Sequence, residues 1–161
     1  MNCWAADRGL PLCEGAAVPK PLALPDVRQS TAYDCGAAVL RCVWDYYGSR
    51  GLRVPATPID GVSPDTLESM LWQSGLSVQA GSMDLGDLAY HTARGRPVVC
   101  CVTEAGQGGH WVVVGGVAWR TVWFHCPSDG PCKEPAADFE RRWTDQTRRG
   151  VRFSRWGISV G

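Results

Sequence analysis

The chain has 161 residues, of which 45% are hydrophobic and 20% charged, a composition typical of one globular domain with a sizeable core. Its 16 basic and 16 acidic residues give a formal net charge of zero, so no global field attracts nucleic acid or an anionic membrane. No apolar run approaches the roughly 18 residues of a membrane span, which argues against a membrane-spanning protein.

The first 25 residues contain four prolines and no hydrophobic period, which predicts an irregular N-terminal arm (residues 1–25) before a single domain (residues 26–161). The start of the chain lacks the basic residues and apolar centre of a signal peptide. We therefore expect a cytoplasmic protein whose eight cysteines are mostly reduced.

The segment that follows the arm places a cysteine where a helix is expected to begin. The apolar spacing after Asp34 predicts a helix over residues 34–47, ended by Gly48. The positive end of its dipole would stabilise a thiolate at Cys35, and Gln29, six residues earlier, has the placement of an oxyanion donor. The alternative is that Cys35 is a buried core thiol.

Two more helices and then several strands are expected further along the chain. Ser63 and Pro64 have the types of an N-cap and a first helical residue, with Gly75 closing that helix. A short helix is expected over residues 85–94, and a helical turn over 136–143. Strands are expected over residues 97–102, 110–117, 121–125 and 151–159. Helices followed by an antiparallel sheet indicate an α+β fold.

His110 begins the most β-branched of these strands, after a pair of glycines. An imidazole there can act as general base to a cysteine from a distant part of the chain, because Cys–His pairs are adjacent in space rather than in sequence. A core histidine satisfied by hydrogen bonds is the alternative for His110.

Several pieces in this order resemble the peptidase C39 family of papain-like cysteine peptidases, known from leader-cleaving domains of bacteriocin and lanthipeptide exporters. The matching pieces are Gln29, Asp34-Cys35-Gly36-Ala37-Ala38, Leu40, Tyr46-Tyr47-Gly48, Gly61-Val62-Ser63, Gly109-His110-Trp111-Val112-Val113, Asp138-Phe139 and Trp143. The resemblance implies a papain-like fold, with N-terminal helices packed on an antiparallel sheet. It also implies that Cys35, His110 and Gln29 are nucleophile, base and oxyanion donor.

The third catalytic position departs from the family, which has an Asp-Pro pair after the strand that follows the histidine. Cys126-Pro127 stands there instead, and Asp129 is the nearest carboxylate that a tight turn would bring back to His110. His125, Cys126 and Cys132 lie near one another in sequence, but no paired C-x-x-C accompanies them. We therefore predict neither a metal nor another cofactor.

The leading functional prediction is a cysteine peptidase that cleaves a peptide or protein, with cleavage after a Gly-Gly-like pair implied by the resemblance. The expected partner is that substrate, either a precursor peptide or a specific partner protein. A papain-like acyltransferase or isopeptidase, and a catalytically silent peptide-binding module, are the alternatives. Arginines crowd the last fifth of the chain, either as a solvated face or as a dock for an acidic peptide: Arg141, Arg142, Arg148, Arg149, Arg152 and Arg155.

Overall fold

The computed structural model describes residues 19–49, 52–54, 61–104, 108–146, 150 and 152–161. The first 18 residues of the expected arm, together with Arg148 and Arg149, lie outside the described residues. The division of the chain at residue 25 therefore stays a prediction.

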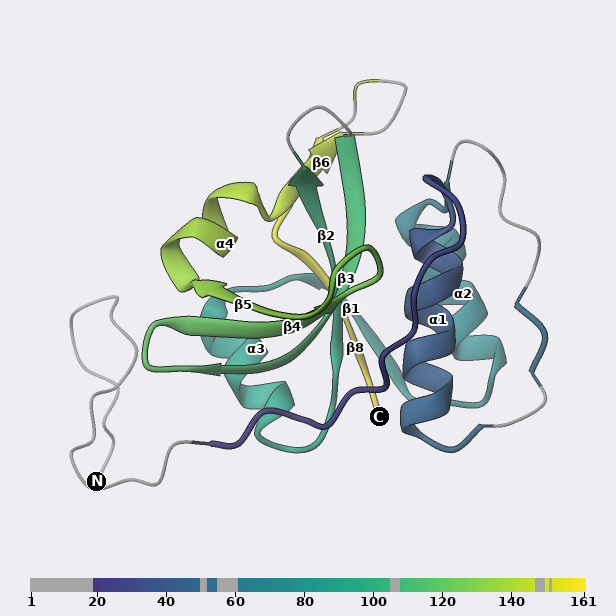
Figure 1. Cartoon of the computed structure of the whole chain (residues 1–161), viewed down its shortest axis with the longest axis horizontal. Helices are drawn as coiled ribbons and strands as arrows, with labels where there is room; N and C mark the ends of the chain where they lie inside the picture. Colours follow the sequence, from purple (N-terminus) through teal and green to yellow (C-terminus); the bar gives the residue numbers. More distant parts are fainter. Residues whose placement is uncertain (1–18, 50–51, 55–60, 105–107, 147–149, 151) are drawn as a thin grey trace.

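A six-stranded antiparallel sheet forms the centre of the molecule, in the order β1-β8-β2-β3-β4-β5 (Figure 1). Its strands are β1 (Val78–Ser82), β2 (Val98–Glu104), β3 (Gly108–Ala118), β4 (Thr121–Cys126), β5 (Gly130–Pro135) and β8 (Trp156–Val160). Strands β6 (Thr144–Gln146) and β7 (Arg152–Ser154) pair separately.

Helices cover both faces of this sheet, α1 (Cys35–Tyr46) and α2 (Pro64–Gln73) on one side, α3 (Leu85–Thr92) and α4 (Ala136–Arg142) on the other (Figure 1). Side chains along β2 and β3 point alternately to the two faces of the sheet, so these strands contribute to the hydrophobic cluster on each face. Cys101 and Trp111 belong to the cluster under α1, whereas Cys100 and Val112 belong to the one under α3 and α4. The adjacent cysteines thus point to opposite faces as core thiols.

The predicted helices form close to their expected bounds because their start and stop signals act as anticipated. Ser63 Oγ accepts a hydrogen bond from the backbone N–H of Thr66 at 3.3 Å, and Gly75 adopts a φ of +83° just after α2. The expected strand over 151–159 is wrong as a single strand. Arg155, at a φ of +54°, breaks it, so that β7 and β8 join different sheets.

Strands β1, β5 and β6 were not predicted. β5 contains two prolines and lies at the edge of the sheet, where a missing N–H is tolerated. The segment before α1 lies against β3, with the Leu22 N–H donating to the Gly115 carbonyl at 2.9 Å. Among the residues described, no helix combines the length and apolarity needed to cross a bilayer.

Candidate active site

Cys35 is the first residue of α1 and is 7% exposed. The Asp34 carboxylate does not cap the helix. It accepts hydrogen bonds from the backbone N–H groups of Ser30 at 3.1 Å and Thr31 at 2.9 Å, which fixes the loop before the cysteine. The helix start is also held close to the following segment, since a Cβ on Gly36 would lie 2.9 Å from Val62.

The free edge of β3 faces the Cys35 sulfur. β3 and β4 pair only from Val113 onward, so residues 108–112 have no β4 partner. The backbone N–H groups of Trp111 and Gly36 are directed at the sulfur and favour its thiolate. Burial nevertheless dominates and raises the pKa of the Cys35 thiol above its ordinary value, whereas the helix start alone had predicted a stabilised thiolate.

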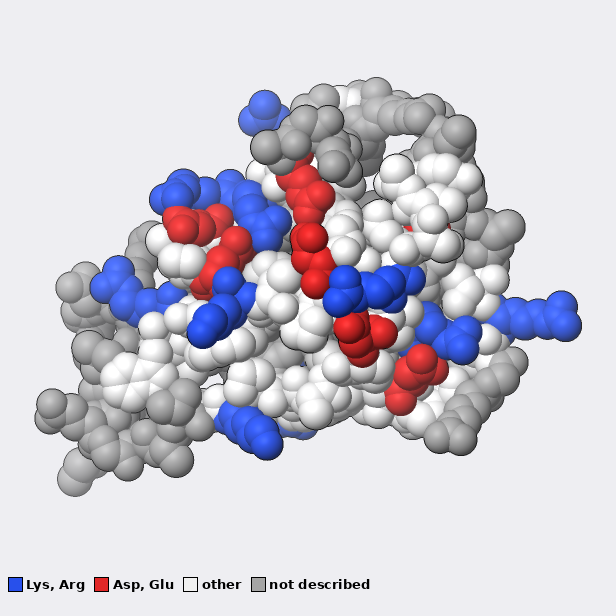
Figure 2. All heavy atoms as spheres, viewed as in Figure 1, with Lys and Arg blue, Asp and Glu red and all other residues white. Residues whose placement is uncertain are grey.

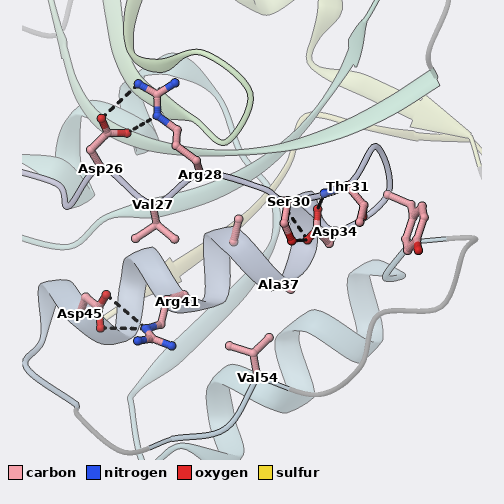
Figure 3. A pocket seen from close by; sticks show the side chains of 12 residues that line it. Asp26, Val27, Arg28, Ser30, Thr31, Asp34, Ala37, Arg41, Asp45 and Val54 are labelled. Carbon is pink, nitrogen blue, oxygen red and sulfur yellow. Dashed lines mark hydrogen bonds and ion pairs between the residues drawn. The ribbon is translucent and has the colours of Figure 1, made fainter.

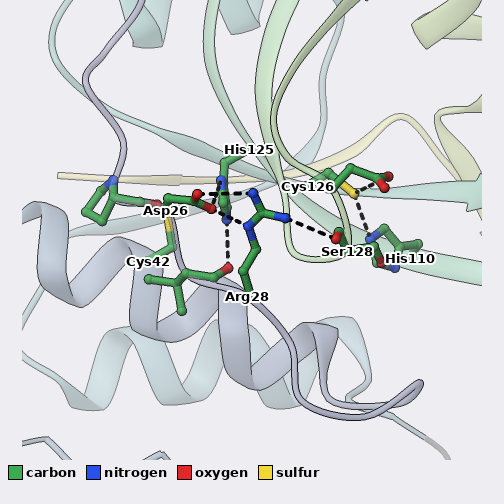
Figure 4. A network of polar contacts seen from close by, with 10 residues as sticks. Asp26, Arg28, Cys42, His110, His125, Cys126 and Ser128 are labelled. Carbon is green, nitrogen blue, oxygen red and sulfur yellow. Dashed lines mark hydrogen bonds and ion pairs between the residues drawn. The ribbon is translucent and has the colours of Figure 1, made fainter.

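His110 lies on β3, is 6% exposed, and turns one ring nitrogen toward the end of β4. Its Nε2 is 3.4 Å from Cys126 Sγ (Figure 4). The same nitrogen is 3.8 Å from Glu104 Oε1. Burial lowers the pKa of His110, while the Glu104 charge opposes that shift, so the imidazole is neutral at pH 7. No hydrogen bond joins Cys35 to His110 among the described residues.

Asp129 contacts the Cys126 thiol rather than the imidazole itself. Its Oδ2 lies 3.5 Å from Cys126 Sγ, and Cys126 stands between it and His110. The expected turn therefore forms, but a hydrogen bond from His110 to Asp129, or to a backbone carbonyl in its loop, is not among those of the described residues.

Glu104 is the carboxylate that sequence reasoning missed. β2 and β3 form a hairpin in which Val102 pairs with His110, so Glu104, two residues further along, is a diagonal neighbour on the same face. The register of that hairpin is the signal that would have found it. Strand periodicity alone does not fix register.

Gln29 lies beside this group, and its backbone N–H donates to the Pro127 carbonyl at 3.0 Å. Its side-chain Nε2 donates to the Thr31 carbonyl at 2.9 Å, while its Oε1 is buried without a hydrogen-bond partner. The structure thus ties the Gln29 loop to the turn after β4. The amide that the resemblance assigns to the oxyanion is engaged within its own loop.

The three residues considered for a metal in the sequence do not gather at one point, and His125 Nδ1 lies 3.9 Å from a different carboxylate, Asp26 Oδ1. His125 points away from Cys126, as alternation on β4 requires, and its Nε2 donates to the Val27 carbonyl at 2.7 Å (Figure 4). Cys132 is a free, partly exposed cysteine on β5. Cys126 instead groups with Glu104 and His110, whose ligand atoms and its own all lie within 4.8 Å of one another.

An open groove of about 710 Å³ runs along α1 and the loop before it (Figure 3). Its charges pair within its own walls, Arg28 with Asp26 and Arg41 with Asp45. Three described C-terminal arginines are similar, since Arg141, Arg142 and Arg155 contact Asp138, Glu134 and Glu140. Acidic side chains accordingly lie among the basic ones near α4 (Figure 2), which favours a solvated face over an acidic-peptide dock.

A sequence model of the peptidase C39 family matches residues 24–147. The chain belongs to the peptidase C39 family. No match was found among curated protein sequences.

Solved C39 peptidase domains share the fold of this family member. One is a double glycine motif protease from an AMS/PCAT transporter, crystallised with its leader peptide, at 18% identity and a TM-score of 0.66, covering 90% of this chain and 98% of that one. Another is the peptidase domain of Streptococcus ComA, a bifunctional ABC transporter involved in quorum sensing, at 18% identity, TM-score 0.68 and 84% and 96% coverage. The Streptococcus mutans ComA peptidase domain gives 17% identity, TM-score 0.64 and 84% and 98% coverage. The papain-like α+β fold predicted from the sequence is confirmed.

Proposed function

We propose that this C39 family member hydrolyses a peptide bond with Cys35 as nucleophile and His110 as general base. The observation that carries the proposal is the orientation of the imidazole. Nε2 of His110 is occupied by Cys126, so Nδ1 is the nitrogen left for the thiol at the start of α1. In a papain-like site, one ring nitrogen faces the nucleophile and the other faces the residue that orients the ring.

In the first step, the Cys35 thiol transfers its proton to His110 Nδ1 as sulfur attacks the carbonyl carbon. The negative oxygen of the tetrahedral intermediate is held by the Cys35 backbone N–H and by Gln29 Nε2, which exchanges its Thr31 carbonyl partner for the oxyanion. The imidazolium then protonates the leaving amine, and a thioester on Cys35 remains. Water hydrolyses the thioester, with His110 again accepting a proton.

The raised pKa of Cys35 and the lowered pKa of His110 favour proton transfer during attack rather than a preformed ion pair. Apo active sites are often looser than their complexes, so the missing Cys35–His110 hydrogen bond is compatible with this sequence of events. Glu104 and Asp129 flank the far side of the imidazole and stabilise its positive charge, Asp129 through Cys126.

The substrate that we propose is a peptide or protein cut after a pair of small residues, as in a Gly-Gly leader site. A related domain was crystallised with a leader peptide, which supports a peptide ligand here. Six free cysteines among the described residues are compatible with action in the cytoplasm, where thiols stay reduced. An acyl transfer from the same thioester to an amine is the second candidate, because the Cys–His pair can activate either water or an amine to attack the thioester.

The test is mass spectrometry of peptides that carry Gly-Gly, Gly-Ala and bulky control sites, incubated with wild type and with Cys35→Ala. Cleavage after the small pair in wild type alone supports the proposal. Adding an amine acceptor distinguishes hydrolysis from transfer by the mass of the product. Gln29→Ala should slow cleavage on the order of 100- to 1,000-fold. A folded wild type that binds the peptides without cleaving any would favour the silent module.

A further inference from the structure

We propose that Glu104, His110 and Cys126 form a site for Zn²⁺ and that zinc bound there switches off the peptidase. The three side chains come from the end of β2, from β3 and from the end of β4, three strands paired within one sheet. Glu104 is partly buried, while His110 and Cys126 are 6% and 3% exposed. Rigid neighbouring strands thus bring three different ligand types to one point.

The distances between the ligand atoms suit a tetrahedral zinc ion. Bonds of about 2.3 Å to sulfur and 2.0 to 2.2 Å to nitrogen and oxygen place pairs of ligand atoms roughly 3.4 to 3.6 Å apart. The observed separation is 3.4 Å from Cys126 Sγ to His110 Nε2 and 3.8 Å from that nitrogen to Glu104 Oε1. All three ligand atoms lie within 4.8 Å of one another, so side-chain shifts of a few tenths of an ångström to about an ångström close the site.

The charges of the site also balance. A Cys126 thiolate and the Glu104 carboxylate supply two negative charges, and neutral His110 adds none, so bound Zn²⁺ leaves this buried site neutral. The thiol proton goes to solvent when the metal binds. Arg142, the basic group whose charge acts on His110, is paired with Glu134 at 2.9 Å.

The thiol at position 126 gives this site its preference for zinc. A carboxylate there would make a site of oxygens and one imidazole, which also suits harder cations, whereas a thiolate selects softer metals such as Zn²⁺. A water molecule completes the fourth position, which keeps the site neutral.

Zinc on Nε2 removes the general base. A histidine that binds a metal through Nε2 carries its proton on Nδ1. That nitrogen then has no lone pair to accept the Cys35 proton. The inhibition rests on the proposed function, whereas the binding of zinc does not.

The test uses the full chain with Cys35→Ala, which removes the other active-site thiol as a ligand. The metal-free protein, kept reduced by a phosphine, is titrated with Zn²⁺ against a chromophoric chelator. We expect one ion per chain, and a loss of affinity of at least about tenfold on adding Cys126→Ser or Glu104→Gln. Cys132→Ser, a matched thiol deletion on the next strand, should leave the affinity unchanged. Co²⁺ should give one thiolate charge-transfer band that Cys126→Ser abolishes.

Two outcomes overturn the site: no zinc bound by the folded Cys35→Ala chain, or binding that Cys126→Ser and Glu104→Gln leave intact. Circular dichroism of each variant shows whether a loss of affinity reflects misfolding. Inhibition is measured separately on wild type, where Zn²⁺ should stop cleavage and a chelator restore it. Zinc binding without inhibition contradicts the switch. A wild type that cleaves nothing refutes the proposed function while the titration still decides the site.

Discussion

At position 126 a thiol occupies the place where the family has the carboxylate of an Asp-Pro pair. It contacts His110 Nε2 at 3.4 Å, but a thiol is a weak acceptor and carries no charge to stabilise an imidazolium. The two nearby carboxylates, Glu104 and Asp129, supply charge from further away. We infer that the His110 imidazole is held less firmly here than the corresponding imidazole in a family member that has aspartate at this position.

Cys126→Asp should therefore raise kcat/KM for a Gly-Gly peptide by about tenfold or more, because a carboxylate orients the imidazole and stabilises its charged form. Cys126→Asn supplies a neutral acceptor without adding a third carboxylate and should give a smaller gain. Steady-state kinetics on both variants measures the effect. A folded Cys126→Asp protein with lower kcat/KM than wild type would mean that the thiol itself is needed at this position.

The raised pKa of Cys35 leads to a second prediction, which concerns the rate at which its thiol is alkylated. Because burial raises its pKa, iodoacetamide should label Cys35 faster as pH rises from about 7 to beyond 9, with no plateau below about pH 8. Cys42, whose pKa burial raises to about 12, and fully buried Cys100 should be labelled far more slowly. Peptide mapping at each pH gives the three rates. A Cys35 rate already constant below pH 7 would instead indicate a preformed ion pair with His110.

Sequence reasoning supplied the candidate residues of the site but not their contacts. Cys35 and His110 were identified from a helix start and a strand start, both of which form. Glu104 was missed because its role depends on the register of a hairpin. The protonation state of Cys35 was misjudged, since burial outweighs the helix start and is a property of the packed molecule.

Among the elements, the start of α1 is fixed by its contact with the segment before α2. Gly36→Ala places a Cβ 2.9 Å from Val62, while Trp111 Nε1 donates to the Val62 carbonyl at 2.9 Å and holds that segment in place. Overpacking of this kind costs about 1 to 3 kcal/mol, against a helix-propensity gain of at most about 1 kcal/mol for alanine. We expect lower unfolding free energy and lower turnover, because Cys35 moves with the helix start.

Val62→Ala in the same chain removes Cγ2, one of the two Val62 atoms that the new Cβ would meet at 2.9 Å, and should recover part of both losses. Denaturant unfolding and peptide cleavage of the two single variants and the double variant measure the coupling. Strictly additive losses would show that Gly36 is required for a reason other than its contact with Val62.

The contact between α3 and β8 predicts how stability depends on pH. His91 is 5% exposed, and its Nδ1 shares a hydrogen bond with Ser159 Oγ at 2.9 Å. Burial and, secondarily, Arg96 and Arg94 lower the pKa of His91 from 6.5, partly opposed by Asp87. The unfolded chain therefore binds the proton more readily, so this stability is full above about pH 6.5 and is lost as pH falls through the lower folded pKa.

We expect the thermal midpoint of wild type to fall between about pH 6.5 and 5 more steeply than that of His91→Gln, which has no imidazole to protonate. Calorimetry at several pH values compares the two slopes. Parallel slopes would assign the acid sensitivity to other groups.

The elements that were predicted share strong local signals, and those that were missed do not. Helix α2 has its serine cap and proline, whereas β5 carries two prolines and forms because β4 offers it a sheet edge. Strand β1 forms by pairing with β8, the last of the described strands, and β2 to β7 lie between the two in sequence. Pairing partners so far apart in sequence leave no trace in a local pattern.

On the scale of the whole molecule, the site exists only where three parts of the chain meet. α1 brings Cys35 to the free edge of β3, β3 carries His110, and the turn after β4 returns to the Gln29 loop through the Pro127 carbonyl. Each part belongs to the segment that the C39 family model matches. The fold thus brings the start of α1 to β3, the strand that carries His110, as the proposed Cys–His pair requires.

The central claim, that Cys35 is the nucleophile of a peptidase, is tested most directly by trapping the enzyme. A peptide ending in Gly-Gly with a vinyl ester in place of the scissile bond is incubated with native protein, and the adduct is located by tandem mass spectrometry. The account predicts one adduct per chain, on Cys35, formed by wild type, slowed strongly by His110→Ala and unchanged by Cys132→Ser. An adduct on another cysteine, or labelling of Cys35 at the same rate in wild type and His110→Ala, would contradict it.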